Sequence, residues 1–170
     1  MNKKTDVIIS VVMGSDSDLP VMTEATKILE EFGIPYELFL TSAHRTPERT
    51  AKFAQGADKR GVKIIIVGAG AAAHLAGVIA SQTQLPVIGV PIDATALHGL
   101  DALLSTVQMP GGIPVATMAI GLAGAKNAAL YAIRILALED KKISTKLAAY
   151  IKKMAVDVEK KQEALSCRKS

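Results

Sequence analysis

The sequence predicts an α/β protein built on a parallel sheet of about five strands with helices on both faces. Short runs rich in β-branched residues alternate with longer segments of helical periodicity along the 170 residues. The run Ile64-Ile65-Ile66-Val67 is apolar at every position, which is typical of a strand covered on both faces. Polar or glycine-rich clusters follow the first three of these runs. Because crossover connections are right-handed, these features favour a three-layer, doubly wound arrangement of the flavodoxin-like type.

The expected elements alternate from a first strand to a C-terminal helix. We expect strands at residues 7–13, 36–41, 63–67, 86–90 and 114–120. We expect helices at residues 19–32, 47–60, 72–82, 100–107 and 123–138, and a last one at about 143–165. No linker or repeat interrupts this pattern, so residues 1–170 are expected to form a single domain. Within it, an α/β core would cover about 7–138 and a basic helical tail about 140–170.

The net charge of +4 is concentrated in the tail. Residues 140–170 hold nine Lys or Arg against four Asp or Glu, so the rest of the chain is nearly neutral. Only 4% of the residues are aromatic, and no basic patch with interleaved aromatic residues occurs in the core region. The composition therefore argues against a nucleic-acid partner. The charged tail is interpreted as the solvated face of a helix.

Cysteine content and hydropathy indicate the expected compartment. The single Cys167 cannot form a disulfide within the chain, which fits a reducing cytosol. The first apolar run is too short for a signal peptide and lacks a small-residue cleavage motif. No stretch is long and apolar enough for a membrane span. We therefore expect a cytoplasmic protein without membrane contact.

The first polar cluster is Gly14-Ser15-Asp16-Ser17-Asp18, directly after the first strand. Free N–H groups and hydroxyls at the start of a helix suit a phosphate. A carboxylate in the same loop suits sugar hydroxyls better than phosphate. The same residues would also serve as an ordinary Ser/Asp N-cap, and the residues alone leave both interpretations open.

The second cluster, Ser42-Ala43-His44-Arg45-Thr46-Pro47, follows the second strand. Thr46 as N-cap and Pro47 as first helical residue are explained by helix initiation. Helix initiation does not explain the presence of His44 and Arg45. A guanidinium can make a forked contact to a phosphate, and an imidazole exchanges a proton near neutral pH. A structural role for a loop histidine remains the alternative.

The third cluster runs from Gly68 to His74 and would let a ligand approach the backbone closely. It also fits the loose dinucleotide pattern G-x-G-x-x-A, with Asp93 twenty residues after Ala73. A protein that binds a nucleotide cofactor is therefore an alternative. However, that pattern normally follows the first strand of a binding domain rather than the third.

Several chemistries lack their sequence signatures. The chain has no Walker phosphate loop, no cluster of zinc ligands and no G-x-S-x-G nucleophile elbow. His44, His74 and His98 have neither a companion cysteine nor regular spacing as metal ligands. We therefore expect neither a metal nor a cofactor.

At this point four motifs resemble those of one family, the class I N5-carboxyaminoimidazole ribonucleotide mutases of purine biosynthesis. This family is also known as the catalytic subunit of phosphoribosylaminoimidazole carboxylase. The motifs are MGSDSD (13–18), SAHRTP (42–47), GAGAAAHLAG (68–77) and LLSTVQMPGGIPVAT (103–117). The resemblance covers residues from about 7 to 138, and the motifs occur in the family's order.

The resemblance implies that a carboxylate on the exocyclic nitrogen of an aminoimidazole ribonucleotide moves to carbon 4 of the ring, without ATP or a metal. The histidine of SAHRTP, here His44, handles the protons in this family. The implied course is decarboxylation to the aminoimidazole and a trapped CO₂, attack by carbon 4 on the CO₂, and removal of the carbon 4 proton by His44. Trapping matters because escaped CO₂ must be recaptured from solvent.

The resemblance also implies a set of residues that bind the substrate. Asp18 is chemically suited to the ribose hydroxyls and Arg45 to the phosphate. Ser15, Asp18 and Arg45 match the family's substrate-binding positions. Ser17 and Ser42 are expected to supply additional hydrogen-bond donors. The residues expected to wall the pocket near the ring and its carboxylate are Gly70, Ala71, His74 and Leu75.

Three positions depart from the family's commonest pattern. Ala71 stands where a second glycine is usual, Ala76 where proline is usual, and residues 93–95 where serine is frequent. A divergent branch of the family carboxylates the aminoimidazole ribonucleotide directly with CO₂. His74 and Arg45 resemble the mutase branch, and direct carboxylation remains the alternative.

The resemblance further implies a homo-octamer with active sites at subunit junctions. An ATP-dependent carboxyaminoimidazole ribonucleotide synthase would supply the substrate. The residues by themselves predict only an oligomer. A nucleotide-binding or scaffold protein without catalysis would keep the fold but make His44 dispensable.

Overall fold

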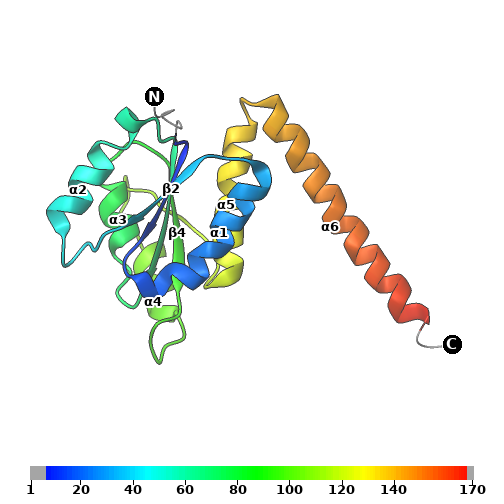
Figure 1. Ribbon diagram of the computed structural model, residues 1–170. Helices are drawn as coiled ribbons and strands as arrows, with labels where there is room; N and C mark the ends of the chain where they lie inside the picture. The colour runs from blue at the N-terminus through cyan, green and yellow to red at the C-terminus, as the bar shows by residue number, and fades with distance from the viewer. Residues whose placement is uncertain (1–6, 168–170) are drawn as a thin grey trace. The chain divides into compact units, whose positions relative to one another are not determined.

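The computed structural model describes residues 7–167 and contains a five-stranded, all-parallel sheet (Figure 1). The strands lie in the order β2-β1-β3-β4-β5. Their bounds are β1 Ile9–Met13, β2 Tyr36–Leu40, β3 Ile64–Gly70, β4 Val87–Ile92 and β5 Ala116–Thr117. This is the flavodoxin-like order, in which the chain direction across the sheet reverses between β1 and β3. The predicted fold class is confirmed.

Residues 7–167 also contain six α-helices and two 3₁₀ turns. The helices are α1 Leu19–Phe32, α2 Pro47–Gln55, α3 Leu75–Ala80, α4 Leu100–Val107, α5 Leu122–Ala137 and α6 Lys141–Cys167. The 3₁₀ turns are η1 Asp16–Asp18 and η2 Asp58–Arg60. α1 covers one face of the sheet, and α2, α3 and α4 cover the other (Figure 1).

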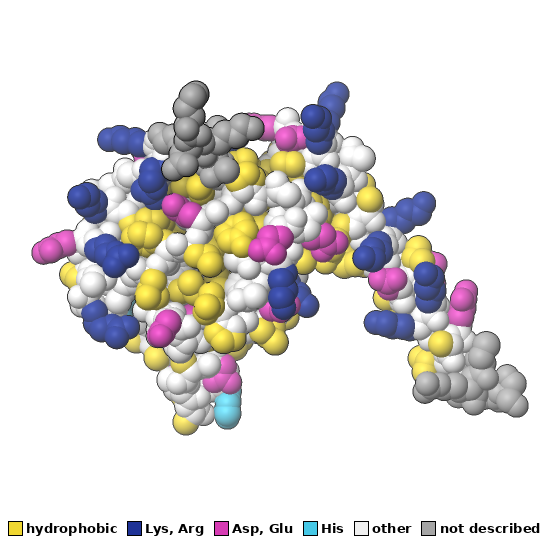
Figure 2. Space-filling model, in the orientation of Figure 1, with side chains coloured by type: hydrophobic (Ala, Val, Ile, Leu, Met, Phe, Trp, Pro, Cys, Tyr) yellow, Lys and Arg dark blue, Asp and Glu magenta, His cyan; other side chains and the backbone are white. Residues whose placement is uncertain are grey.

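The chain forms two compact units, one ending at Ala132 and the other beginning at Ile133, within α5. The second unit contains α6, whose lysine side chains are exposed (Figure 2). Among residues 7–167, no helix combines the length and hydropathy needed to cross a bilayer. Residues 1–6 and 168–170, which the predicted single domain includes, lie outside the described residues.

The core lies on both faces of β3, the central strand. Ile64, Ile65, Ile66 and Val67 are all at most 1% exposed, as the continuous apolar run predicts. On the face toward α2 and α3, alternate residues of β3 pack with Phe53, Ala54 and Ile79 in one apolar cluster. Alternation along a strand sends the intervening residues to the opposite face, which α1 covers.

Gly68 marks the closest approach between β3 and α1. A Cβ built at this position would overlap the sulfur of Met22 and lie 2.8 Å from its Cγ. It would also lie 3.1 Å from Cδ1 of Ile92 on β4. Met22 is fully buried and Ile92 is 4% exposed, so neither side chain has free space to move into.

The structure differs from the expected elements around the third loop. β3 continues to Gly70, three residues beyond the expected end, because Gly70 still pairs with Ile92 of β4. Ala71 then takes a left-handed backbone conformation with φ +52°, which interrupts regular structure. The following helix consequently begins at Leu75 rather than at residue 72.

Two other elements are shorter than expected. The second predicted helix ends at Gln55 with Gly56 as its C-cap, and the separate turn η2 follows it. β5 has only two residues in place of the expected 114–120. Pro114 has no N–H to donate, and beyond the strand single bonds from Met118 to Gly89 and from Gly121 to Pro91 replace a regular ladder.

Candidate active site

A cavity of about 340 Å³ opens at the carboxyl ends of β1, β2 and β3. In parallel α/β sheets, ligands bind at this edge, next to the point where the strand order reverses. All ten residues predicted for the site line this cavity: Ser15, Ser17, Asp18, Ser42, His44, Arg45, Gly70, Ala71, His74 and Leu75. The three loops predicted to carry the site therefore meet in one place.

The first loop is organised by its own hydroxyls and carboxylates. The Ser15 hydroxyl accepts a hydrogen bond from the backbone N–H of Ser17 at 3.3 Å. The Asp18 carboxylate accepts one from the N–H of Ser15 at 3.0 Å, which completes a capping box around η1. The capping interpretation is thus correct for Ser15, although the capped element is the short η1 and not α1. It does not conflict with ligand binding, since both residues also line the cavity.

Asp18 is a buried carboxyl group at the edge of the cavity. Only 5% of the residue is exposed. Burial raises the pKa of its carboxyl group above 3.8, and hydrogen bonds from the backbone N–H groups of Ser15 and Gly14 partly offset this. A buried acceptor fixed by its own loop is suited to neutral hydroxyl donors, such as those of a sugar.

The second loop holds Arg45 through Ser42. The Ser42 hydroxyl accepts hydrogen bonds from the backbone N–H of Arg45 at 3.2 Å and from its Nε at 3.5 Å. Nη2 of Arg45 donates to the carbonyl oxygen of Gly14 at 3.4 Å, so the guanidinium bridges the first two loops. These contacts leave further guanidinium N–H groups available for an anion.

Thr46 occupies the predicted N-cap position of α2, and Pro47 is the first helical residue. The hydroxyl of Thr46 makes no capping hydrogen bond to the helix. It donates instead to the carbonyl of Ser42 at 3.0 Å and accepts from the N–H of Ser42 at 3.0 Å. Thr46 therefore closes the loop that presents His44 and Arg45.

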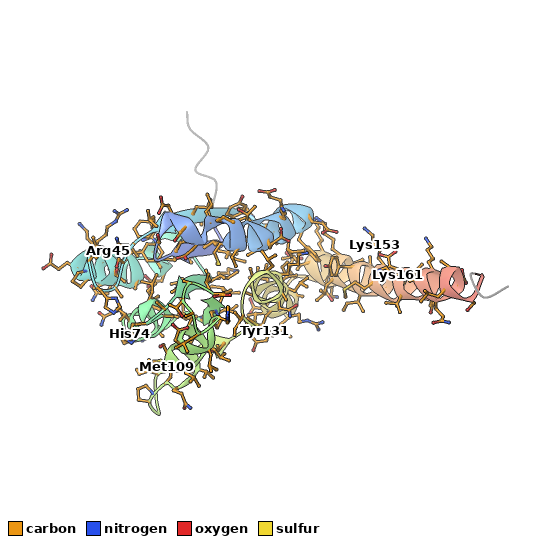
Figure 3. The ribbon with its side chains drawn as sticks, turned by 90° about the horizontal axis from the view of Figure 1, so that it is seen from below. Arg45, His74, Met109, Tyr131, Lys153 and Lys161 are labelled. Atoms are coloured by element: carbon orange, nitrogen blue, oxygen red, sulfur yellow. The ribbon has the colours of Figure 1, made fainter. Side chains whose placement is uncertain are left out.

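The third loop supplies a further part of the cavity wall, and Figure 3 labels Arg45 of the second loop and His74 of the third. Tight backbone bonds join the N–H of Ala73 to the carbonyl of Ala71, and the N–H of His74 to that of Ala72, both at 2.8 Å. Leu75 is 3% exposed and anchors the loop in the core. A Cβ at Gly70 would overlap Ala94 from the loop after β4, which explains the need for glycine there.

His44 and His74 are hydrogen-bonded to each other. Nε2 of His44 lies 2.8 Å from Nδ1 of His74, and the rings meet edge to face at 80°. One of the two nitrogens must carry the proton and the other accept it. The bond leaves Nδ1 of His44 and Nε2 of His74 for other partners. The two histidines thus form one hydrogen-bonded pair in the wall of the cavity.

Sequence reasoning did not anticipate this pairing, nor the small residues that complete the cavity wall. His44 follows β2 and His74 follows β3, and β1 lies between these strands. The remaining wall is formed by backbone and small side chains, including Ala43, Ala72 and Ala94. The usable signal would have been that both histidines come a few residues after a strand end. Small apolar residues carry no such signal.

The third histidine is elsewhere. His98 does not line the cavity, and its Nδ1 lies 3.5 Å from Oδ2 of Asp93. Among residues 7–167, no three His, Cys, Asp or Glu side chains lie close enough together to hold a metal ion. The segment Gly68–His74, considered as a dinucleotide pattern, ends the third strand of the sheet rather than the first, and α3 begins directly after it at Leu75.

Comparison with known proteins identifies the family. A sequence profile of AIR carboxylase matches residues 8–157, most of the chain. The chain belongs to the AIR carboxylase family. It is 59% identical over 163 residues to the N5-carboxyaminoimidazole ribonucleotide mutase of Pyrococcus horikoshii, covering 96% of this chain and 91% of that protein. The corresponding mutase of Thermotoga maritima is 53% identical, covering 92% of this chain and 91% of that protein.

The chain is also similar to a solved structure and to a longer relative that bears a different enzyme name. The crystal structure of Treponema denticola PurE matches this AIR carboxylase family member with a TM-score of 0.84 at 29% identity, covering 93% of this chain and 98% of that one. The phosphoribosylaminoimidazole carboxylase of Candida albicans is 52% identical, covering 95% of this chain but only 28% of that protein. The resemblance inferred from the four motifs is confirmed.

Proposed function

We propose that this AIR carboxylase family member is an N5-carboxyaminoimidazole ribonucleotide mutase, with His44 as the residue that transfers protons. The observation that carries the proposal is the hydrogen bond between His44 and His74 inside the cavity that Arg45 also lines. It joins a proton-transfer unit to a binding site for an anion. The relatives of highest listed identity that bear the mutase name support the same reaction.

The reaction needs a proton at one step and releases one at another. Cleavage of the N–CO₂ bond gives CO₂ and leaves the electron pair on the exocyclic nitrogen, which takes up a proton. Carbon 4 of the ring then forms a bond to the CO₂ carbon. Loss of the proton from carbon 4 restores the aromatic ring. One imidazole that donates the first proton and accepts the last returns to its starting state.

The cavity accounts for the binding of the other parts of the substrate. We assign the phosphate to Arg45 with Ser17 and Ser42, because a guanidinium and hydroxyls are its preferred donors. We assign the ribose hydroxyls to the carboxyl group of the buried Asp18, which accepts their hydrogen bonds. The loop with Gly70, Ala71, His74 and Leu75 walls the ring and its carboxylate, and its apolar side chains retain the CO₂ beside carbon 4.

The test is to mix the purified protein with N5-carboxyaminoimidazole ribonucleotide, or with aminoimidazole ribonucleotide plus bicarbonate, and to follow the 4-carboxylate. If the protein is a mutase, we expect rapid conversion of N5-carboxyaminoimidazole ribonucleotide and only slow conversion of aminoimidazole ribonucleotide with bicarbonate. His44→Asn is expected to lower kcat by about 10²- to 10⁴-fold with the fold intact. His98→Asn, which alters a histidine outside the cavity, is the matched control.

Direct carboxylation of aminoimidazole ribonucleotide is the second candidate. It is favoured by the carboxylase name of the Candida albicans relative. Efficient turnover with bicarbonate and the aminoimidazole alone would establish it. If neither mixture yields product, the enzyme assignment is wrong, and a binding role for the cavity takes its place.

We also propose that the enzyme acts as a homo-oligomer, an octamer by family resemblance. In support, Leu100, Leu104 and Val107 recur along α4 at helical spacing, and Leu97 lies three residues before the helix; all four are about half exposed, at 47–59%. Light scattering on the purified protein gives the subunit number. Because the substrate is an unstable carbamate, an ATP-dependent synthase in the same cytoplasm would have to supply it.

A further inference from the structure

A second cavity of about 450 Å³ adjoins the candidate active site. The two cavities share Gly14, Ser15, Ser42 and Arg45 in their walls. On its other side the second cavity is lined by Arg49 of α2. It contains two arginines and one carboxylate, that of Asp16, so its charged side chains favour an anion.

Arg49 is held against an aromatic platform. Its guanidinium carbon lies 4.9 Å from the centre of the Phe39 ring on β2. That ring is itself stacked on Phe53, with centres 4.2 Å apart and planes at 17°. Stacking restrains a long side chain that would otherwise lose much entropy on binding a ligand.

The charge of Arg49 is not neutralised within the described chain. No salt bridge joins it to a carboxylate among residues 7–167. It also lies in the first turn of α2, where the helix dipole disfavours a cation and favours an anion. A fixed guanidinium at this end of a helix, facing a cavity, is arranged to meet an anion from outside the chain.

Arg60 shows the arrangement of an arginine that has only a structural role. It also stacks on an aromatic ring, with its guanidinium carbon 4.8 Å from the centre of Phe53. However, its Nη2 donates to Glu37 at 3.1 Å and its Nη1 to the carbonyl of Phe53 at 3.4 Å. Arg60 lines neither cavity. The absence of such partners distinguishes Arg49.

We infer that Arg49 is a second cation for the substrate's phosphate, acting from the adjoining cavity alongside Arg45. This inference rests on the proposed function. The ring and its carboxylate occupy the cavity with His44 and His74, and the phosphate lies where Ser42 and Arg45 line both cavities. Arg49 approaches the phosphate from the side of the second cavity. It binds the phosphate and takes no part in the chemical step.

The experiment compares Arg49→Gln with Arg60→Gln as the matched control for loss of a stacked arginine. Calorimetry measures the Kd of 4-carboxy-5-aminoimidazole ribonucleotide and of its phosphate-free ribonucleoside. We expect Arg49→Gln to raise the Kd of the nucleotide about five-fold, as for one solvent-accessible charged contact, and to leave that of the ribonucleoside unchanged. In turnover, KM should rise to a similar extent while kcat changes by less than about two-fold. Arg60→Gln should alter neither Kd.

Two results would overturn the inference. One is an unchanged nucleotide Kd in Arg49→Gln, and the other is equal weakening of nucleotide and ribonucleoside. Arg49→Lys, which keeps the charge without the planar fork, should lie between Arg49→Gln and the unaltered protein. Failure of the proposed function is distinguishable, because binding is measured without turnover. If the protein converts neither substrate but Arg49→Gln still weakens nucleotide binding, the mutase proposal is wrong and the inference that Arg49 binds the phosphate stands.

Discussion

Gly68→Ala tests how tightly α1 packs on the sheet beneath the candidate site. The added methyl group would overlap the sulfur of Met22 and press on Cδ1 of Ile92 at 3.1 Å. Both side chains are buried, so they must leave their preferred rotamers or the helix must shift. Overpacking of this kind costs about 1–3 kcal/mol of unfolding free energy. For a chain of this size, each kcal/mol lowers Tm by about 2–4 °C.

Urea titration followed by circular dichroism measures this loss, with Gly111→Ala as the matched control. A Cβ at Gly111 meets nothing within 4 Å, so that substitution should change the unfolding free energy by less than about 0.5 kcal/mol. Adding Met22→Ala to Gly68→Ala should cost less than the two changes summed, by about 1 kcal/mol, because the methyl group fills part of the new space. Equal stability of Gly68→Ala and Gly111→Ala would refute the packing argument.

Three further predictions follow from the loops. Ala71→Gly should raise the unfolding free energy by about 0.5 kcal/mol in urea, because a left-handed conformation costs alanine more than the extra freedom of unfolded glycine; no gain would contradict this. Burial raises the pKa of Asp18 above 3.8, so the ionised carboxylate destabilises the fold at higher pH. Asp18→Asn should therefore stabilise the protein at neutral pH, with a gain in urea midpoint that disappears below about pH 3. His74→Asn should lower kcat about ten-fold or more, while His98→Asn, as control, should not.

The fold was predictable because its strands β3 and β4 are buried and apolar on both faces. In β3 this signal is unambiguous, and the strand lies where the run of isoleucines indicates. The start of α3 was not predictable from local preference, since Ala71 and Ala72 have the highest helix propensity of all residues. Pairing of Gly70 with Ile92 extends the strand and forces Ala71 into a left-handed conformation, which is a tertiary effect.

The candidate site was predictable to the level of loops. Parallel strands bring their carboxyl ends to one edge, so the polar clusters after β1, β2 and β3 had to lie near one another. The bond between His44 and His74 depends on distances across the intervening strand β1, which no sequence pattern encodes. The inference about Arg49 could not be drawn from the sequence, where this arginine is one charged residue in the first turn of an ordinary helix.

Apart from Ala94, every residue that lines the candidate active site precedes residue 76. The later half of the chain supplies β4, which pairs with the central strand, the edge strand β5, and the exposed surface of α4. The two candidate catalytic histidines and the exposed apolar surface of α4 are thus encoded in successive halves of one chain. Substitutions on the exposed face of α4 therefore change the apolar surface of this enzyme without replacing a residue that lines the candidate active site.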